Sequence, residues 1–187
     1  MCTAFPPTIT TFHSILTSEV SSKLQIEMFQ RVAVGQQAPD FELEAVQEEE
    51  FVTINLKSFK GKYVVLLFYN RDFTKVCESE LKLFSDRINE FKSANCQLLA
   101  ISTDSKYTHL AWTGRWGMGP LQIPLLSDHT HTTARTYEVL NVDGHSESAL
   151  FIIDSDGILR VSIVQDSRIE RSVDETLRLL KKLQKSG

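Results

Sequence analysis

The feature that most constrains the fold is an unbroken apolar run, Tyr63–Tyr69, in a chain of 187 residues. Its sequence, YVVLLFY, contains no charged residue, which is typical of a central strand covered on both faces. No stretch of the chain approaches the 18 or so consecutive apolar residues of a membrane span. Together with the alternation of strand and helix patterns that follows it, this run predicts an α/β fold.

The rest of the chain alternates between helix and strand patterns. After the run, apolar residues recur at steps of three and four from Leu81 to Phe91, which predicts an amphipathic helix. The further elements predicted, in chain order, are a buried strand at Gln97–Ser102, helices at Tyr107–Trp112 and His129–Tyr137, strands at Ala149–Ile153 and Ile158–Val164, and a final helix that begins with the capping-box pattern Ser172–Glu175. This order predicts a thioredoxin-like fold with a central mixed sheet and flanking helices.

Composition bounds the organisation and the partners of the chain. We expect an N-terminal extension over residues 1–30, with a helical piece around Ser18–Phe29, and one domain over residues 31–187. The net charge of −4 argues against a dedicated nucleic-acid binder, and the N-terminus lacks the pattern of a secretory signal. We therefore expect a cytoplasmic protein that binds neither nucleic acid nor membrane.

Three cysteines, Cys2, Cys77 and Cys96, occur without Cys-x-x-Cys spacing. An odd number in this arrangement is neither a secreted disulfide framework nor a zinc site. The segment Asp128–His131 (DHTH) has residue types that bind metals, but it lies where Ser127 or Asp128 would cap a helix, so local capping is the stronger interpretation. Other histidines are scattered and join no recognisable cluster: His13, His109 and His145. We expect no metal and no cofactor.

Cys77 has the most informative position. Thr74 is a candidate N-cap, which places Cys77 in the first turn of the helix that follows the buried strand. Free N–H groups and the helix dipole there favour a thiolate over a thiol, and α/β folds place their sites at this end of a strand. A lone cysteine is also commonly a small buried apolar residue, and position alone does not choose between the two.

The segment around Cys77, Phe68–Glu80 (FYNRDFTKVCESE), is similar to the active-site segment of the peroxiredoxins, the thiol-specific antioxidant family. The resemblance extends over about residues 31–187 and is closest to the typical two-cysteine branch. Further matching segments stand in family order: GQQAPDF, KGKYVVLLFY, LLAISTDS, HLAW, PLLSD, LFIIDSDGILR and RSVDETLRLL. The resemblance implies a thiol-dependent peroxidase.

The resemblance also implies residue roles. Cys77 matches the peroxidatic cysteine, whose thiolate attacks the peroxide and becomes a sulfenic acid. Thr74 matches the threonine that positions the peroxide. Glu80 and Arg171 match a glutamate and an arginine that the family pairs, and a plain ion pair between two helices is the alternative role. Trp112 matches a tryptophan near the substrate, although a buried packing residue is the better interpretation.

The implied substrate is hydrogen peroxide or an alkyl hydroperoxide. The implied reductant is thioredoxin or another thiol. Members of the family form homodimers, often assembled further into rings, so we expect a homodimer and leave a ring open.

Several positions depart from the family pattern. Asn70 replaces a proline that shields the thiolate, Ser148 replaces an arginine that holds the peroxide, and Glu78 places a negative charge beside Cys77. By comparison with the family pattern, we expect all three changes to disfavour the thiolate and to slow its chemistry. Arg71 would supply the missing charge in one hypothesis, while an exposed loop arginine is the favoured interpretation.

The family's C-terminal resolving cysteine has no counterpart in this sequence. Cys96 is expected to be structural and Cys2 stays unassigned, so we expect a one-cysteine cycle in which an external thiol reduces the sulfenic acid. Two alternatives stay open: a catalytically impaired paralogue that acts as an oligomeric chaperone or redox-signalling partner, and a thioredoxin-fold binding module that never used Cys77.

Overall fold

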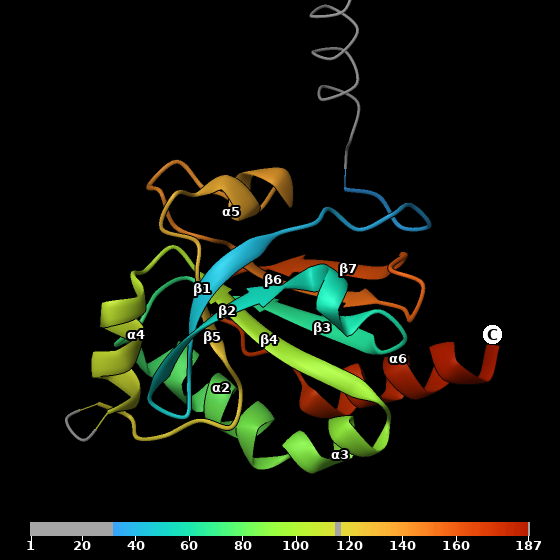
Figure 1. The fold of residues 1–187 in the computed structure, drawn as a ribbon, viewed down its shortest axis with the longest axis horizontal. Helices are drawn as coiled ribbons and strands as arrows, with labels where there is room; N and C mark the ends of the chain where they lie inside the picture. The colour runs from blue at the N-terminus through green and yellow to red at the C-terminus, as the bar shows by residue number, and fades with distance from the viewer. Residues whose placement is uncertain (1–31, 115–116, 187) are drawn as a thin grey trace, which may run out of the picture. The chain divides into compact units, whose positions relative to one another are not determined.

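The apolar run forms β3 (Tyr63–Phe68), an inner strand of a seven-stranded mixed sheet. A computed structural model describes residues 32–114 and 117–186 of the chain (Figure 1). β3 pairs in parallel with β4 (Cys96–Ser102) and antiparallel with β6 (Ser148–Ile153). The predicted mixed sheet is therefore confirmed, with its apolar run near the centre.

Four further strands complete the sheet in the order β2-β1-β5-β4-β3-β6-β7. β4 continues the parallel pairing to β5, and each remaining pair is antiparallel. Their bounds are β1 (Glu42–Gln47), β2 (Glu50–Asn55), β5 (Leu125–Ser127) and β7 (Leu159–Gln165). The acidic run between β1 and β2 is an exposed turn in which Glu48 and Glu49 have positive φ.

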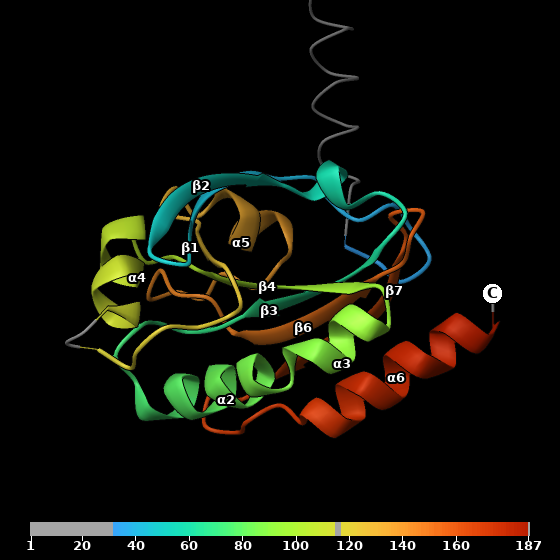
Figure 2. The same cartoon turned by 60° about the horizontal axis from the view of Figure 1, so that its bottom comes forward.

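Side chains of β3 alternate between two apolar cores. Val65, Leu67 and the following Tyr69 belong to one core, whereas Leu66 and Phe68 belong to the other. The helices that surround these cores are α2 (Lys75–Asp86), α3 (Ile88–Ser93), α4 (Lys106–Thr113), α5 (Thr132–Thr136) and α6 (Val173–Ser186), with a 3-10 turn, η1 (Leu56–Phe59). Figure 2 shows α2, α3 and α6 on one face of the sheet and α5 on the other.

The boundaries confirm most of the predicted elements, but the helix predicted from Leu81 to Phe91 is divided into α2 and α3 at Arg87, whose φ and ψ of −104° and 17° are not helical. α5 is shorter than predicted and begins after His131, which is the N-cap residue in place of Ser127 or Asp128. The carboxylate of Asp128 still accepts the N–H groups of Thr133 and Ala134 in the first turn, at 3.0 and 2.6 Å. That contact is the local capping predicted for the DHTH segment. At α6 the N–H of Glu175 donates to Ser172 Oγ at 3.2 Å, as the capping-box pattern predicts.

Two further expectations concern a helical piece near the N-terminus and membrane-spanning segments. The helical piece expected around Ser18–Phe29 lies outside the described residues. Within residues 32–114 and 117–186, no helix has the length and apolar character needed to cross a membrane.

Candidate active site

Cys77 lies in the first turn of α2, just beyond the carboxyl end of β3, as the sequence predicts. Its side chain is 4% exposed and packs in the core on the α2 face of the sheet. The carbonyl of Thr74 accepts the N–H of Glu78 at 2.9 Å, so Thr74 is the N-cap by its backbone. The Thr74 side chain makes no cap bond, because Oγ1 donates instead to the carbonyl of Arg71 at 3.1 Å.

Trp112 of α4 lies in the same core as Cys77 and is almost fully buried. Its ring centroid is 6.0 Å from that of Tyr69 and 6.1 Å from that of Phe73. Phe73 is itself 60% exposed and has a positive φ of 58°. Trp112 therefore packs in this core and against the loop that precedes α2.

Glu80 and Arg171 form a buried ion pair that joins α2 to the segment before α6. Arg171 donates to Glu80 Oε1 from its backbone N–H at 2.7 Å and from Nε at 2.8 Å, while Nη2 donates to Oε2. Nη1 donates to the carbonyl of Phe68 at 2.8 Å and to that of Ala149. One guanidinium thus fixes the helix of Cys77 against the ends of both β3 and β6.

A second buried polar cluster holds the loop between β3 and α2. Tyr69 Oη donates to Asp72 Oδ1 at 2.8 Å, and His109 Nδ1 lies 2.8 Å from Asp72 Oδ2. Burial raises the pKa of the Asp72 carboxyl, and burial followed by the nearby Asp72 charge raises the pKa of Tyr69. The backbone N–H of Asp72 also donates to Asp104 Oδ2 at 2.8 Å.

The expectation that His109 joins no cluster was therefore wrong. His109 lies on α4 and Asp72 in the loop, 37 positions apart, so no local pattern relates the two. The available signal was an acidic residue beside the active-site strand and a histidine on a predicted helix. Their contact depends on how α4 packs against the end of the sheet.

Asn70 and Ser148, the two positions that depart from the proline and arginine of the family pattern, carry no positive charge. Asn70 Nδ2 donates to the carbonyl of Ser146 at 3.4 Å, a long contact. Ser148 is buried at the start of β6, where it pairs with Gln165 of β7. Arg71 is exposed, as its favoured interpretation states.

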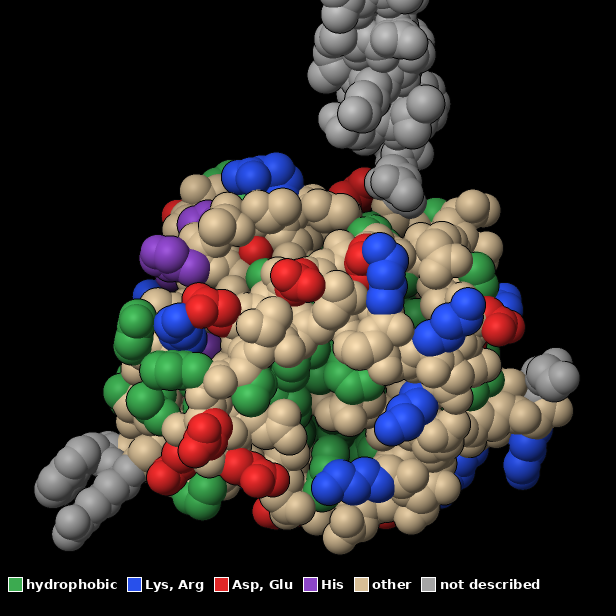
Figure 3. All heavy atoms as spheres, in the orientation of Figure 1, with side chains coloured by type: hydrophobic (Ala, Val, Ile, Leu, Met, Phe, Trp, Pro, Cys, Tyr) green, Lys and Arg blue, Asp and Glu red, His purple; other side chains and the backbone are tan. Residues whose placement is uncertain are grey.

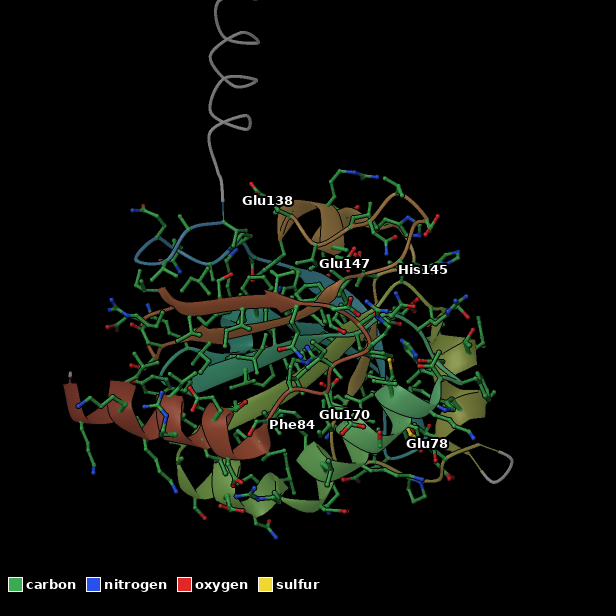
Figure 4. The ribbon with its side chains drawn as sticks, turned by 180° about the vertical axis from the view of Figure 1, so that it is seen from behind. Glu78, Phe84, Glu138, His145, Glu147 and Glu170 are labelled. Atoms are coloured by element: carbon green, nitrogen blue, oxygen red, sulfur yellow. The ribbon has the colours of Figure 1, made fainter. Side chains whose placement is uncertain are left out.

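Two carboxylates lie close in sequence to Cys77 and Arg171. Glu78 is paired with Lys82 one turn later, Nζ to Oε1 at 2.6 Å, which offsets part of its charge. Glu170 accepts a hydrogen bond from Ser79 Oγ. Figure 4 shows Glu78 and Glu170 on the same side of the molecule.

Cys96 lies at the opposite end of the sheet from Cys77. It is the first residue of β4 and stands beside Tyr63, the first residue of β3, whereas Cys77 follows the last residue of β3. At about 3.3 Å per residue, the six residues of β3 span roughly 20 Å. Burial raises the pKa of the Cys96 thiol to about 12, which makes it a poor nucleophile.

Metal ligands do not gather in the part of the chain that the structure describes: no three His, Cys, Asp or Glu side chains there come within reach of one ion. The nucleophilic side chain at the Cys77 end of β3 is that of Cys77 itself, in the first turn of α2. A thioredoxin-like sheet that presents a cysteine in the first turn of a helix defines a class of thiol-based redox enzymes.

Comparisons with known proteins narrow this class. The AhpC/TSA family matches residues 34–162. The chain is 48% identical over 155 residues to a putative peroxiredoxin, ycf42, of Porphyra purpurea and 47% identical over 156 residues to peroxiredoxin-2 of Bos taurus. Each alignment covers 81% of this chain and 78% of the relative.

Solved structures agree with the sequence relatives. The reduced 2-Cys peroxiredoxin of Plasmodium vivax has a TM-score of 0.79 and 42% identity, with 82% of each chain covered. AhpC of Enterococcus faecalis has a TM-score of 0.77 and 30% identity, covering 81% of this chain and 92% of that one. The chain therefore belongs to the AhpC/TSA family, the peroxiredoxins, which are thiol-dependent peroxidases.

Removing the guanidinium of Arg171 should strongly destabilise the domain. Arg171→Met leaves the Glu80 carboxylate buried without its partner, which costs about 3–5 kcal/mol in the free energy of unfolding measured with urea. Arg178→Met is the matched control, because Arg178 pairs with Glu175 on an exposed face and such a pair contributes about 1 kcal/mol or less. Equal losses in the two variants would contradict the role assigned to the buried pair.

Cys96 should make stability fall at high pH. The unfolded thiol releases its proton near its ordinary pKa of 9, whereas the folded thiol holds it until about 12, so the unfolded state binds fewer protons in this range. Between pH 9 and 11, the free energy of unfolding of the wild type should fall more steeply than that of Cys96→Ala, by up to about 1.4 kcal/mol per pH unit. Below pH 8 the two curves should run parallel. Parallel curves at all pH values would show that the thiol is not protected by burial.

Proposed function

We propose that Cys77 is the peroxidatic cysteine and that the chain reduces hydrogen peroxide or a small alkyl hydroperoxide. The observation that carries this proposal is the placement of Cys77 in the first turn of α2, beyond the carboxyl end of β3. Backbone N–H groups of a first turn have no partner within the helix, and they stabilise negative charge on sulfur or on a departing oxygen.

The reaction oxidises the Cys77 sulfur by two electrons. The thiolate attacks one peroxide oxygen, an S–O bond forms and the O–O bond breaks. The departing oxygen takes up a proton and leaves as water or an alcohol, and the cysteine becomes a sulfenic acid. A first thiol then displaces water from the sulfenic acid to give a mixed disulfide, and a second thiol releases Cys77 again.

Three other residues assist in this proposal. Thr74 contacts the peroxide: its Oγ1 already donates to Arg71, so its free lone pairs accept a hydrogen bond from the peroxide O–H. Glu80 and Arg171 are positioning residues, because the hydrogen bonds of Arg171 to Glu80, Phe68 and Ala149 hold α2 against the sheet. Trp112 borders the substrate region through its contact with Phe73.

A one-cysteine cycle is the second part of the proposal. Cys96 is buried, has a raised pKa and lies about the length of β3 away from Cys77, so it is badly placed to attack a Cys77 sulfenic acid. Thioredoxin or another external thiol then supplies both electrons.

The proposal also includes a homo-oligomeric assembly, at least a dimer, and a cytoplasmic location. One structural neighbour, a modified peroxiredoxin of Plasmodium yoelii, is described as an artifactual octamer.

One set of observations favours the second candidate, an impaired paralogue that acts as a chaperone or signalling partner. Ser148 stands where the family arginine is expected, and it offers neither a charge nor a set of donors. Asn70 stands where the family proline is expected and makes only a long contact with Ser146. The two candidates differ in the rate of peroxide reduction.

Peroxide consumption by the wild type and Cys77→Ser separates the candidates. Stopped-flow measurement with a thiol reductant should give a wild-type rate far above background and a background rate for Cys77→Ser, while Cys96→Ala keeps most of the activity. After one equivalent of peroxide, mass spectrometry should find a trapped sulfenic acid at Cys77 and no disulfide between Cys77 and Cys96. Equal background rates for the wild type and Cys77→Ser would exclude the enzyme proposal.

Restoring a guanidinium should accelerate the reaction. Ser148→Arg places donors and positive charge at the position that the family uses, so the second-order rate constant for hydrogen peroxide should rise roughly tenfold or more. Ser162→Arg is the matched control, because it adds the same charge at an exposed position of β7. An unchanged rate in a folded Ser148→Arg protein would mean that this position does not limit the chemistry.

A further inference from the structure

A cavity of about 400 Å³ opens at the end of the sheet opposite Cys77. Three segments frame it: residues 37–40, η1 with the loop that leads into β3, and the turn at residues 154–157 between β6 and β7. Buried apolar side chains of the second core line its interior, among them Leu56, Val64 and Ile153. Its volume lies within the range of roughly 300–1,000 Å³ that small-molecule sites occupy.

Backbone hydrogen bonds fix the three framing segments to one another. Ala38 N–H donates to the carbonyl of Gly157 at 2.9 Å, and Gln37 Nε2 donates to the same oxygen at 3.0 Å. Gly61 N–H donates to the carbonyl of Ser155 at 2.9 Å. The cavity is therefore formed by the fold itself, without rearrangement, which lowers the ordering cost of binding.

The rim of the cavity has more positive than negative groups outside ion pairs. Lys57 is paired with Asp40 at 2.5 Å. Burial opposes ionisation of Asp154, but hydrogen bonds from backbone N–H groups and from Arg160 outweigh it and lower the pKa of that carboxyl. The two other lysines at the rim are Lys60 and Lys62, and no carboxylate within residues 32–114 and 117–186 forms an ion pair with either of them. Besides these two ammonium groups, the rim has one exposed carboxylate outside an ion pair, that of Asp156.

The surface around the cavity is also positively charged. In Figure 3, Lys and Arg side chains gather on the side of the face where η1 and the turn between β6 and β7 lie, whereas Asp and Glu side chains gather near the turn between β1 and β2. A ligand with an apolar body and one negative group matches both the apolar interior and this rim. A cationic or uncharged ligand would match the interior alone.

We propose that this cavity binds a small amphiphilic carboxylate, of the kind represented by a medium-chain fatty acid. The hydrocarbon part packs against Leu56, Val64 and Ile153, and the carboxylate lies between the ammonium groups of Lys60 and Lys62. The site is separate from Cys77 by the length of β3, so binding does not depend on peroxidase chemistry.

The test is a titration of the full-length protein with sodium hexanoate, octanoate and decanoate, each below its micelle concentration, followed by amide chemical shifts in NMR. Saturable shifts should concentrate on residues 37–40, 56–64 and 153–157. Binding should tighten roughly tenfold for every two CH₂ groups, because each buried CH₂ adds to the transfer free energy. Shifts without saturation, or spread evenly over the surface, would overturn the proposal.

Charge reversal tests the rim. Lys60→Glu/Lys62→Glu should weaken decanoate binding at least fivefold, and both positions are exposed, so the fold is preserved. Lys92→Glu/Lys181→Glu is the matched control, with the same charge change on α3 and α6. Equal affinities of the two double variants would exclude a site at this rim. Cys77→Ser should bind decanoate like the wild type, so failure of the peroxidase proposal is distinguishable from failure of this one.

Discussion

The ion pair between Glu80 and Arg171 is the interaction on which the site geometry depends. A carboxylate and a guanidinium removed from water are tolerated only when nearly every donor and acceptor finds a partner. Arg171 meets that condition by donating to Glu80 and to the carbonyls of Phe68 and Ala149. The first two turns of α2, and with them Cys77, therefore have one position relative to the ends of two neighbouring strands.

The Tyr69–Asp72–His109 cluster constrains the same region from the other side. It holds the loop before α2 against α4, while the ion pair holds the helix after that loop. The cysteine thus lies between two buried polar anchors in an otherwise apolar core. Such anchors are directional, so they fix orientation in a way that apolar packing alone does not.

Two kinds of feature could be predicted from the sequence: those set by neighbouring residues, and those implied by the resemblance to the family. β3 was predicted because its apolar run is unbroken, and Cys77 at a helix start follows from the strand and cap pattern beside it. The contact between Asp72 and His109 was missed because it depends on the path of a loop and the packing of a distant helix. The lysine-rimmed cavity was missed for the same reason, since its walls come from three separated segments.

The alternation of β3 between two cores has a consequence for how the fold tolerates change near the thiol. Val65, Leu67 and Tyr69 face the core that contains Cys77, whereas Leu66 and Phe68 face the other core, two of whose residues, Phe68 and Ala149, accept hydrogen bonds from Arg171 through their backbone carbonyls. The side chains of the second core therefore stabilise the fold from the face of the sheet away from Cys77. A change of side chain at Asn70 or Ser148, neither of which belongs to the second core, therefore leaves the packing of that core in place.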